Sequence, residues 1–208
     1  MDFLILAILI AIGSYALTSR DQRLRIATLG SHLGQYQIEK LMETVTQGYL
    51  RALGEKDLAR QEQIWALLNT SEAQLADQFK RFANEFAKAG TEQTRVSKIA
   101  IALPYADTLF PSATFDLRKA FAIHAQGIAR AAETPIGGLG GSGGSSAKDK
   151  AFTMSAELFL MQHTCHWFCK SKTVASARMM ARHQTTYAQL VAAVSPETRK
   201  AYCSLVEA

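Results

Sequence analysis

The sequence has few cysteines and no familiar catalytic motif in its proper context. Only Cys165, Cys169 and Cys203 occur among 208 residues. This odd, low number is not typical of a disulfide-stabilised secreted domain, and it agrees with a reducing compartment such as the cytoplasm. The chain has no Walker phosphate loop and no His-Glu-x-x-His zinc motif, and the glycines at 137–144 lack the flanking strand that a nucleotide-binding loop or a nucleophile elbow requires. These absences favour a non-enzymatic function.

Charge is absent from residues 3–17, which read FLILAILIAIGSYAL. As a helix, these fifteen residues reach about 22 Å, against about 30 Å of bilayer hydrocarbon. The uncharged Thr18 and Ser19 lengthen the segment, and nearby arginine side chains can extend toward the headgroups. The sequence therefore predicts a single transmembrane helix over 1–19. A buried or interfacial helix and a cleaved signal peptide, with a small-residue site at 14–16, are the alternatives.

Basic residues lie on only one side of this apolar segment. Arg20, Arg23 and Arg25 follow it closely, whereas no lysine or arginine precedes it. Positive charge is retained on the cytoplasmic side of membranes. We therefore expect the amino terminus outside and the body of the protein in the cytoplasm.

The overall composition is that of a globular protein, with 48% hydrophobic and 20% charged residues. The net charge of +5 is uneven. Residues 1–136 carry fifteen basic and fourteen acidic side chains, whereas residues 137–208 carry eight and four. Contact with anionic lipid or nucleic acid is one explanation of this excess, and an ordinary solvated surface is the other. The candidate basic patch comprises Lys170, Lys172, Arg178 and Arg182.

Helical spacing of apolar residues recurs through the first half of the chain, and it predicts helices over 38–53, 58–68 and 69–86. Gly54 is a suitable stop for the first helix, and Asn69 with Glu72 resembles a capping box for the third. The stripe of Leu75, Phe79, Phe82 and Phe86 is interpreted as packed core.

The segment before the linker is less regular. Residues 96–103 are expected to form a short helix or an extended connector, because no second run pairs with them convincingly. Residues 105–110 are expected to form a loop that is tucked in. Ser112 or Thr114 is expected to cap the next helix. That helix contains His124, which is interpreted as a hydrogen-bonded core residue, with a ligand or an acid–base group as the alternative.

The run GGLGGSGGSS at 137–146 predicts a flexible linker. The chain is thereby divided into an anchor (1–19), a helical body (20–136), the linker (137–146) and a carboxy-terminal helical segment (147–208). Helices are expected over 148–170 and 173–194, with a third starting at Ser195-Pro196-Glu197. Six large apolar residues are expected to be buried against the body or in another chain: Phe152, Leu158, Phe159, Met161, Trp167 and Phe168.

One cluster of potential metal ligands occurs, formed by His163, Cys165, His166 and Cys169. On a helix these side chains fan over about 160°, so that several of them can approach one zinc ion, with His183 or Cys203 as a further ligand. However, structural zinc sites usually draw ligands from a turn as well, and free cysteine is commonly buried. Core packing is therefore the favoured interpretation.

Taken together, these patterns predict an all-α protein with one transmembrane helix, a cytoplasmic helical-bundle body and a carboxy-terminal helical segment. The expected function is a non-enzymatic scaffold that recruits another protein at the lipid bilayer. One alternative is a metal- or redox-dependent protein, with zinc as the possible cofactor. The other is an anionic-lipid or nucleic-acid binder acting through the basic patch, of which nucleic acid is the less expected ligand.

Overall fold

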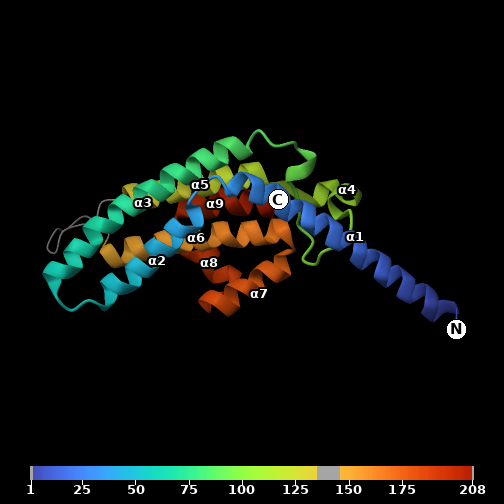
Figure 1. Ribbon diagram of the computed structural model, residues 1–208, viewed down its shortest axis with the longest axis horizontal. Helices are drawn as coiled ribbons and strands as arrows, with labels where there is room; N and C mark the ends of the chain where they lie inside the picture. The colour runs from blue at the N-terminus through green and yellow to red at the C-terminus, as the bar shows by residue number, and fades with distance from the viewer. Residues whose placement is uncertain (1, 135–145, 208) are drawn as a thin grey trace.

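The computed structural model describes residues 2–134 and 146–207, and within them it is all-α. The predicted fold class is thus confirmed. Figure 1 shows an elongated bundle from which one long helix projects. The expected linker lies almost entirely outside the described residues, and only Ser146 of it is described, as the N-cap of the helix that follows.

Helix α1, Asp2–Leu33, is continuous. Its first half projects away from the bundle, and its second half packs against α6 and α3 (Figure 1). The helix is long and apolar enough to cross a membrane, and none of its most apolar window is buried. Phe3, for example, is 90% exposed, whereas Leu29 is buried. The buried-core-helix alternative for the apolar segment is therefore wrong.

Helices α2, Ile38–Gly54, and α3, Leu58–Phe86, form a hairpin. The predicted helix start at Asn69 is wrong, because α3 runs through this residue without a break. The apolar residues keep helical spacing across Asn69, and the helix continues with them. Glu72 therefore does not cap a helix; its buried carboxylate accepts a hydrogen bond from the Tyr49 hydroxyl at 2.6 Å.

A small irregular region separates α3 from α5. Its elements are η1 (Glu92–Thr94), β1 (Arg95–Ser97), α4 (Ala106–Leu109), η2 (Pro111–Ala113) and β2 (Thr114–Asp116). The strands pair antiparallel, with Val96 opposite Phe115. Residues 96–103 were expected to have no pairing partner, and this expectation is wrong for Val96 and Ser97, which belong to β1. The pairing could not be recognised in the sequence because strands of three residues are too short to show alternation.

Helix α5 comprises Leu117–Glu133, and its N-cap lies beyond both of the expected caps. Its N-cap is Asp116, whose carboxylate accepts a hydrogen bond from the Arg118 amide at 2.9 Å. Ser112 and Thr114 belong instead to η2 and β2.

The carboxy-terminal helices are α6 (Ala147–Cys169), α7 (Lys172–His183), α8 (Tyr187–Ala193) and α9 (Pro196–Val206). The single helix expected over 173–194 is wrong, because Gln184 adopts a left-handed conformation with φ of 50° that ends α7. Thr186 and Gln189 then form a capping box that starts α8. The predicted start of α9, with Ser195 as the cap and Pro196 next, is confirmed.

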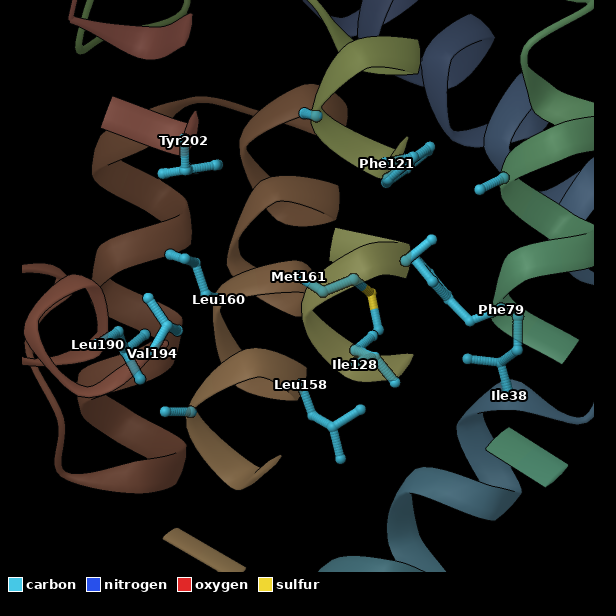
Figure 2. Close-up of a cluster of buried hydrophobic side chains, with 14 of the residues drawn as sticks. Ile38, Phe79, Phe121, Ile128, Leu158, Leu160, Met161, Leu190, Val194 and Tyr202 are labelled. Carbon is cyan, nitrogen blue, oxygen red and sulfur yellow. The ribbon is translucent and has the colours of Figure 1, made fainter. Parts of the chain in front are cut away.

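Helices from both sides of the expected linker share one hydrophobic core (Figure 2). Helix α5 packs against α3, α6 and α9. The carboxy-terminal segment therefore folds back on the body. The aromatic stripe of α3 lies in this core as interpreted, with its three phenylalanines fully buried. Phe152 is an exception to the expected burial, because 65% of it is exposed.

Candidate functional site

The projecting half of α1 is a large apolar surface that no other described element covers. Its exposed large apolar residues are Phe3, Leu4, Ile5, Leu6, Ile8, Leu9, Ile10, Ile12, Tyr15 and Leu17. A soluble monomer rarely exposes such a contiguous apolar surface, because contact with water is unfavourable for every side chain in it. By its length and composition, α1 could cross a lipid bilayer.

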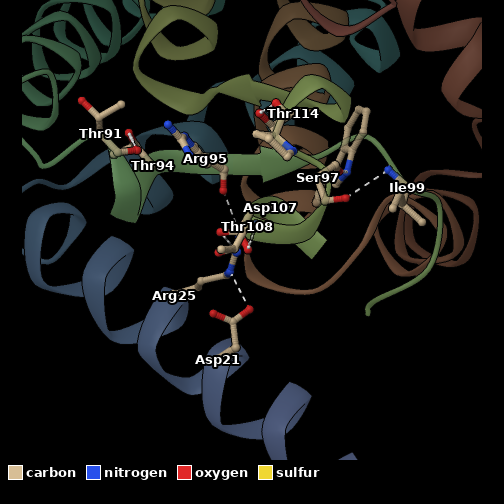
Figure 3. Close-up of polar contacts among 12 residues, drawn as sticks. Asp21, Arg25, Thr91, Thr94, Arg95, Ser97, Ile99, Asp107, Thr108 and Thr114 are labelled. Atoms are coloured by element: carbon tan, nitrogen blue, oxygen red, sulfur yellow. Dashed lines mark hydrogen bonds and ion pairs between the residues drawn. The ribbon is translucent and has the colours of Figure 1, made fainter. Parts of the chain in front are cut away.

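The junction between this segment and the body centres on Arg25 (Figure 3). Its guanidinium donates to Asp21 Oδ2 at 2.8 Å on the same helix and to Asp107 Oδ2 at 3.0 Å on α4. It also donates to the Arg95 carbonyl at 2.9 Å on β1. Arg25 thus fastens α1 to the body. From its place in the sequence, Arg25 was expected only to flank the anchor on the cytoplasmic side.

The end of α6 and the start of α7 reach the same junction. Lys170 Nζ donates to Gln22 Oε1 of α1 at 2.7 Å, and the Thr173 amide donates to the Ala100 carbonyl at 3.1 Å. Trp167, which is buried, donates from Nε1 to the Ser97 carbonyl at 2.9 Å. The carboxy-terminal segment therefore helps to hold α1 and the irregular region together.

The structure divides the candidate basic patch into two parts. Lys170 is bound to α1, and Lys172 Nζ lies 4.9 Å from the Trp167 ring centroid, so these two cations are engaged at the junction. Arg178 and Arg182 are exposed one turn apart on α7. Binding of nucleic acid or anionic lipid by the patch stays a prediction.

The candidate metal ligands are mostly occupied by neighbouring side chains. His163 is buried with its Nε2 3.1 Å from Ser176 Oγ, and His166 Nδ1 accepts from Arg178 at 3.0 Å. The Cys165 thiol lies 3.8 Å from the Met161 sulfur. Within residues 2–134 and 146–207, no group of three or more His, Cys, Asp or Glu side chains is placed to hold a metal ion.

Burial sets the protonation of these groups. It raises the pKa of Cys169 to about 11 and that of Cys165 further, so both thiols are protonated at neutral pH. It also lowers the pKa of His163 and of His166 to about 4 each, with smaller contributions from nearby basic groups. Metal binding and redox reactivity need a thiolate, which this environment disfavours. The geometry thus supports core packing, and the metal-site hypothesis stays a prediction.

We expect a chelator to leave the melting temperature of the protein unchanged. Cys165→Ala and Cys169→Ala should each cost only about 1 kcal/mol, as for the average substitution, because only packing is lost. Thermal melts of the wild type and both variants, with and without chelator, measure this. A wild-type melting temperature that falls sharply with chelator, and cysteine variants that no longer respond, would establish a metal site.

His124 is a hydrogen-bonded core residue, as interpreted from the sequence. It is fully buried, and its Nε2 lies 2.9 Å from Thr164 Oγ1. The Thr164 hydroxyl donates to the Leu160 carbonyl at 3.0 Å, so it accepts from His124 Nε2–H and from the Tyr202 hydroxyl. Burial, with a smaller effect of His163, lowers the pKa of His124 to about 3.

Three histidines whose pKa is lowered by burial, His124, His163 and His166, should make the protein less stable in mild acid. Their folded-state pKa values of about 3 to 4 lie below the ordinary 6.5, so the unfolded chain binds more protons between these limits. The free energy of unfolding should therefore fall as the pH drops below about 6.5, by up to about 1.4 kcal/mol per pH unit for each histidine. Urea unfolding at a series of pH values tests this, with His163→Gln expected to flatten the slope. A wild-type slope equal to that of His163→Gln would contradict it.

An open groove of about 630 Å³ brings together acidic residues of α2 with residues of the candidate zinc cluster and of the candidate basic patch. Glu39 and Glu43 of α2 line it opposite His166, Arg182 and His183. Of the candidate zinc ligands, His166 and His183 line this groove, whereas His163, Cys165 and Cys169 do not.

Comparison with known proteins finds no matching family model, no matching curated protein and no matching solved structure.

Proposed function

We propose that the protein is a non-enzymatic, membrane-anchored scaffold whose helical body holds a partner protein at the cytoplasmic face of a bilayer. The observation that carries this proposal is the continuity of α1. One helix supplies the uncovered apolar segment and, a few residues later, the Arg25 contacts that fasten the body to it. The body would therefore follow the anchor closely rather than move on a long tether.

The flanking charges support the orientation. Arg20 and Arg23 are both exposed directly after the apolar segment, where they are free to face lipid headgroups. Basic residues that flank a membrane-spanning segment are retained on the cytoplasmic side. The body is accordingly proposed to lie in the cytoplasm.

A candidate partner surface lies at the opposite end of the molecule. The turn between α2 and α3 is remote from the amino terminus (Figure 1). The helix ends that meet at this turn expose Leu50 and Leu53 of α2 and Leu58 of α3. Clustered exposed leucines favour association with another protein. The anchor would thus hold this distal tip at a distance from the bilayer.

Site-specific photo-crosslinking in intact membranes tests the scaffold proposal. A photoreactive residue at Leu50 should give a discrete higher-mass adduct, and the additional change Leu53→Glu should diminish it. The matched control is Lys200, an exposed position on α9. Absence of an adduct at Leu50, or the same products at both positions, would contradict recruitment through the tip.

A further inference from the structure

A second apolar surface lies in the irregular region, between residues 101 and 110. Five large apolar side chains within these ten residues are between 41% and 66% exposed: Ile101, Leu103, Tyr105, Leu109 and Phe110. Residues 105–110 were expected to form a loop that is tucked in. That expectation is wrong, because Ala106–Leu109 form α4 and because Tyr105 and Phe110 are exposed. So dense a group of exposed apolar residues indicates contact with something other than water.

The loop lies beside α1 at the point where the apolar segment ends. Ile101 and Leu103 line one crevice with Thr18 and Gln22 of α1. Along a helix, Gln22 is about 7.5 Å beyond Leu17. The headgroup region on each side of a bilayer is about 5–8 Å thick. If the hydrocarbon boundary lies near Leu17, the loop is level with the headgroups.

The rest of the structure holds the loop in this position. Asp107 of α4 is paired with Arg25 of α1 at 3.0 Å, and the Ala100 carbonyl accepts a hydrogen bond from the Thr173 hydroxyl at 2.8 Å. Figure 1 shows α4 at the end of the body from which α1 projects. Tyr105 adopts a left-handed conformation with φ of 58° immediately before α4, which is uncommon for a bulky residue. The exposed side chains are therefore fixed beside the anchor.

The chemistry of the neighbouring residues suits the membrane interface. Tyr105 and Tyr15 are exposed aromatic residues of the type that concentrates at headgroup level. Arg20 and Arg23 supply exposed positive charge on the same stretch of α1. Apolar, aromatic and basic groups thus occur together, as in segments that lie in the interface.

From these observations we infer that residues 101–110 form a second, interfacial contact with the bilayer that holds α1. The exposed side chains insert among the headgroups and the upper acyl chains. This contact adds apolar surface at the end of an anchor whose charge-free part reaches only about 22 Å, so it relieves the mismatch with about 30 Å of hydrocarbon. It rests on the proposed anchoring by α1, and it orients the body against the membrane surface.

Quenching by brominated lipid tests the inference on the full chain. The protein is reconstituted into phosphatidylcholine–phosphatidylglycerol vesicles that carry bromine in the upper part of the acyl chains. Leu109→Trp places an indole in the loop, and Leu67→Trp is the matched control at an exposed position on α3. Trp65 and Trp167 are common to both variants, so differences from the wild type report the added indole. Flotation of the same samples measures anchoring separately.

The Leu109→Trp indole is expected to be quenched and blue-shifted, whereas the Leu67→Trp indole is not. If the protein floats with the vesicles but the Leu109→Trp indole is not quenched, the loop does not contact the bilayer, although α1 still anchors the protein. Equal quenching of both indoles would overturn it as well, because the body would then adsorb without this orientation. Protein that fails to float would overturn the proposed anchoring itself.

Discussion

Lys150→Met should lower the free energy of unfolding by about 3–5 kcal/mol, because it leaves a buried carboxylate without its cation. Lys150 and Glu72 are both almost fully buried, and Lys150 Nζ lies 2.7 Å from Glu72 Oε2. The same ammonium donates to Asn69 Oδ1 at 3.1 Å and to the Ala132 carbonyl at 3.0 Å. The pair therefore fastens the first turn of α6 to α3 and α5.

The double variant Lys150→Met/Glu72→Leu is the control for this effect. Removing both charges avoids the unpaired carboxylate, so most of the lost stability should return, although the Tyr49 hydroxyl then loses its acceptor. Urea unfolding of the full chain in detergent, followed by circular dichroism, measures both variants. A single variant as stable as the wild type would show that the pair does not stabilise the fold.

Trp167→Ala should also cost about 3–5 kcal/mol, the range for removal of a large buried aromatic side chain. Its ring meets Phe115 edge-on, with the ring centroids 5.0 Å apart, and its indole nitrogen donates to the Ser97 carbonyl. The substitution removes packing between α6 and both short strands. It also leaves a carbonyl next to the anchor junction without its donor.

Trp167→Phe separates the two contributions, because it keeps much of the ring but loses the hydrogen bond. We expect it to cost clearly less than Trp167→Ala. Trp65→Ala is a second control, since Trp65 is only half-buried and its loss should be milder. Thermal melts of the three variants measure this, and a Trp167→Ala melting temperature equal to that of Trp65→Ala would contradict the packing account.

The long helices and the core could be predicted because their apolar residues repeat with the helical period. Phe79, Phe82 and Phe86 are one example, and the apolar run of α6 with Leu158 and Phe168 is another. In α3 the pattern reports which face is buried, whereas α6 is apolar and buried on most of its sides. A helix cap was predictable where neighbouring residues all favour a helix start, as at Ser195, which Pro196 and Glu197 follow.

The junction could not be predicted, because its contacts join residues that are distant in the sequence. Arg25 is 82 residues from Asp107, and Lys170 is 148 residues from Gln22. A single sequence gives no signal for such pairs. Strands of three residues are likewise too short for alternation to be visible, so the β1–β2 pairing and the exposed loop between the strands were missed.

Extraction of membranes with alkaline carbonate tests most directly whether α1 anchors the protein. The full chain is predicted to remain in the membrane pellet, because insertion of an apolar helix is not screened by salt or reversed by high pH. The double variant Ile8→Lys/Ile10→Lys changes two exposed residues at the middle of the apolar segment. Each lysine raises the free energy of membrane insertion by about 3 kcal/mol, so this variant should move to the supernatant. Release of the unaltered chain by carbonate would contradict the membrane anchor.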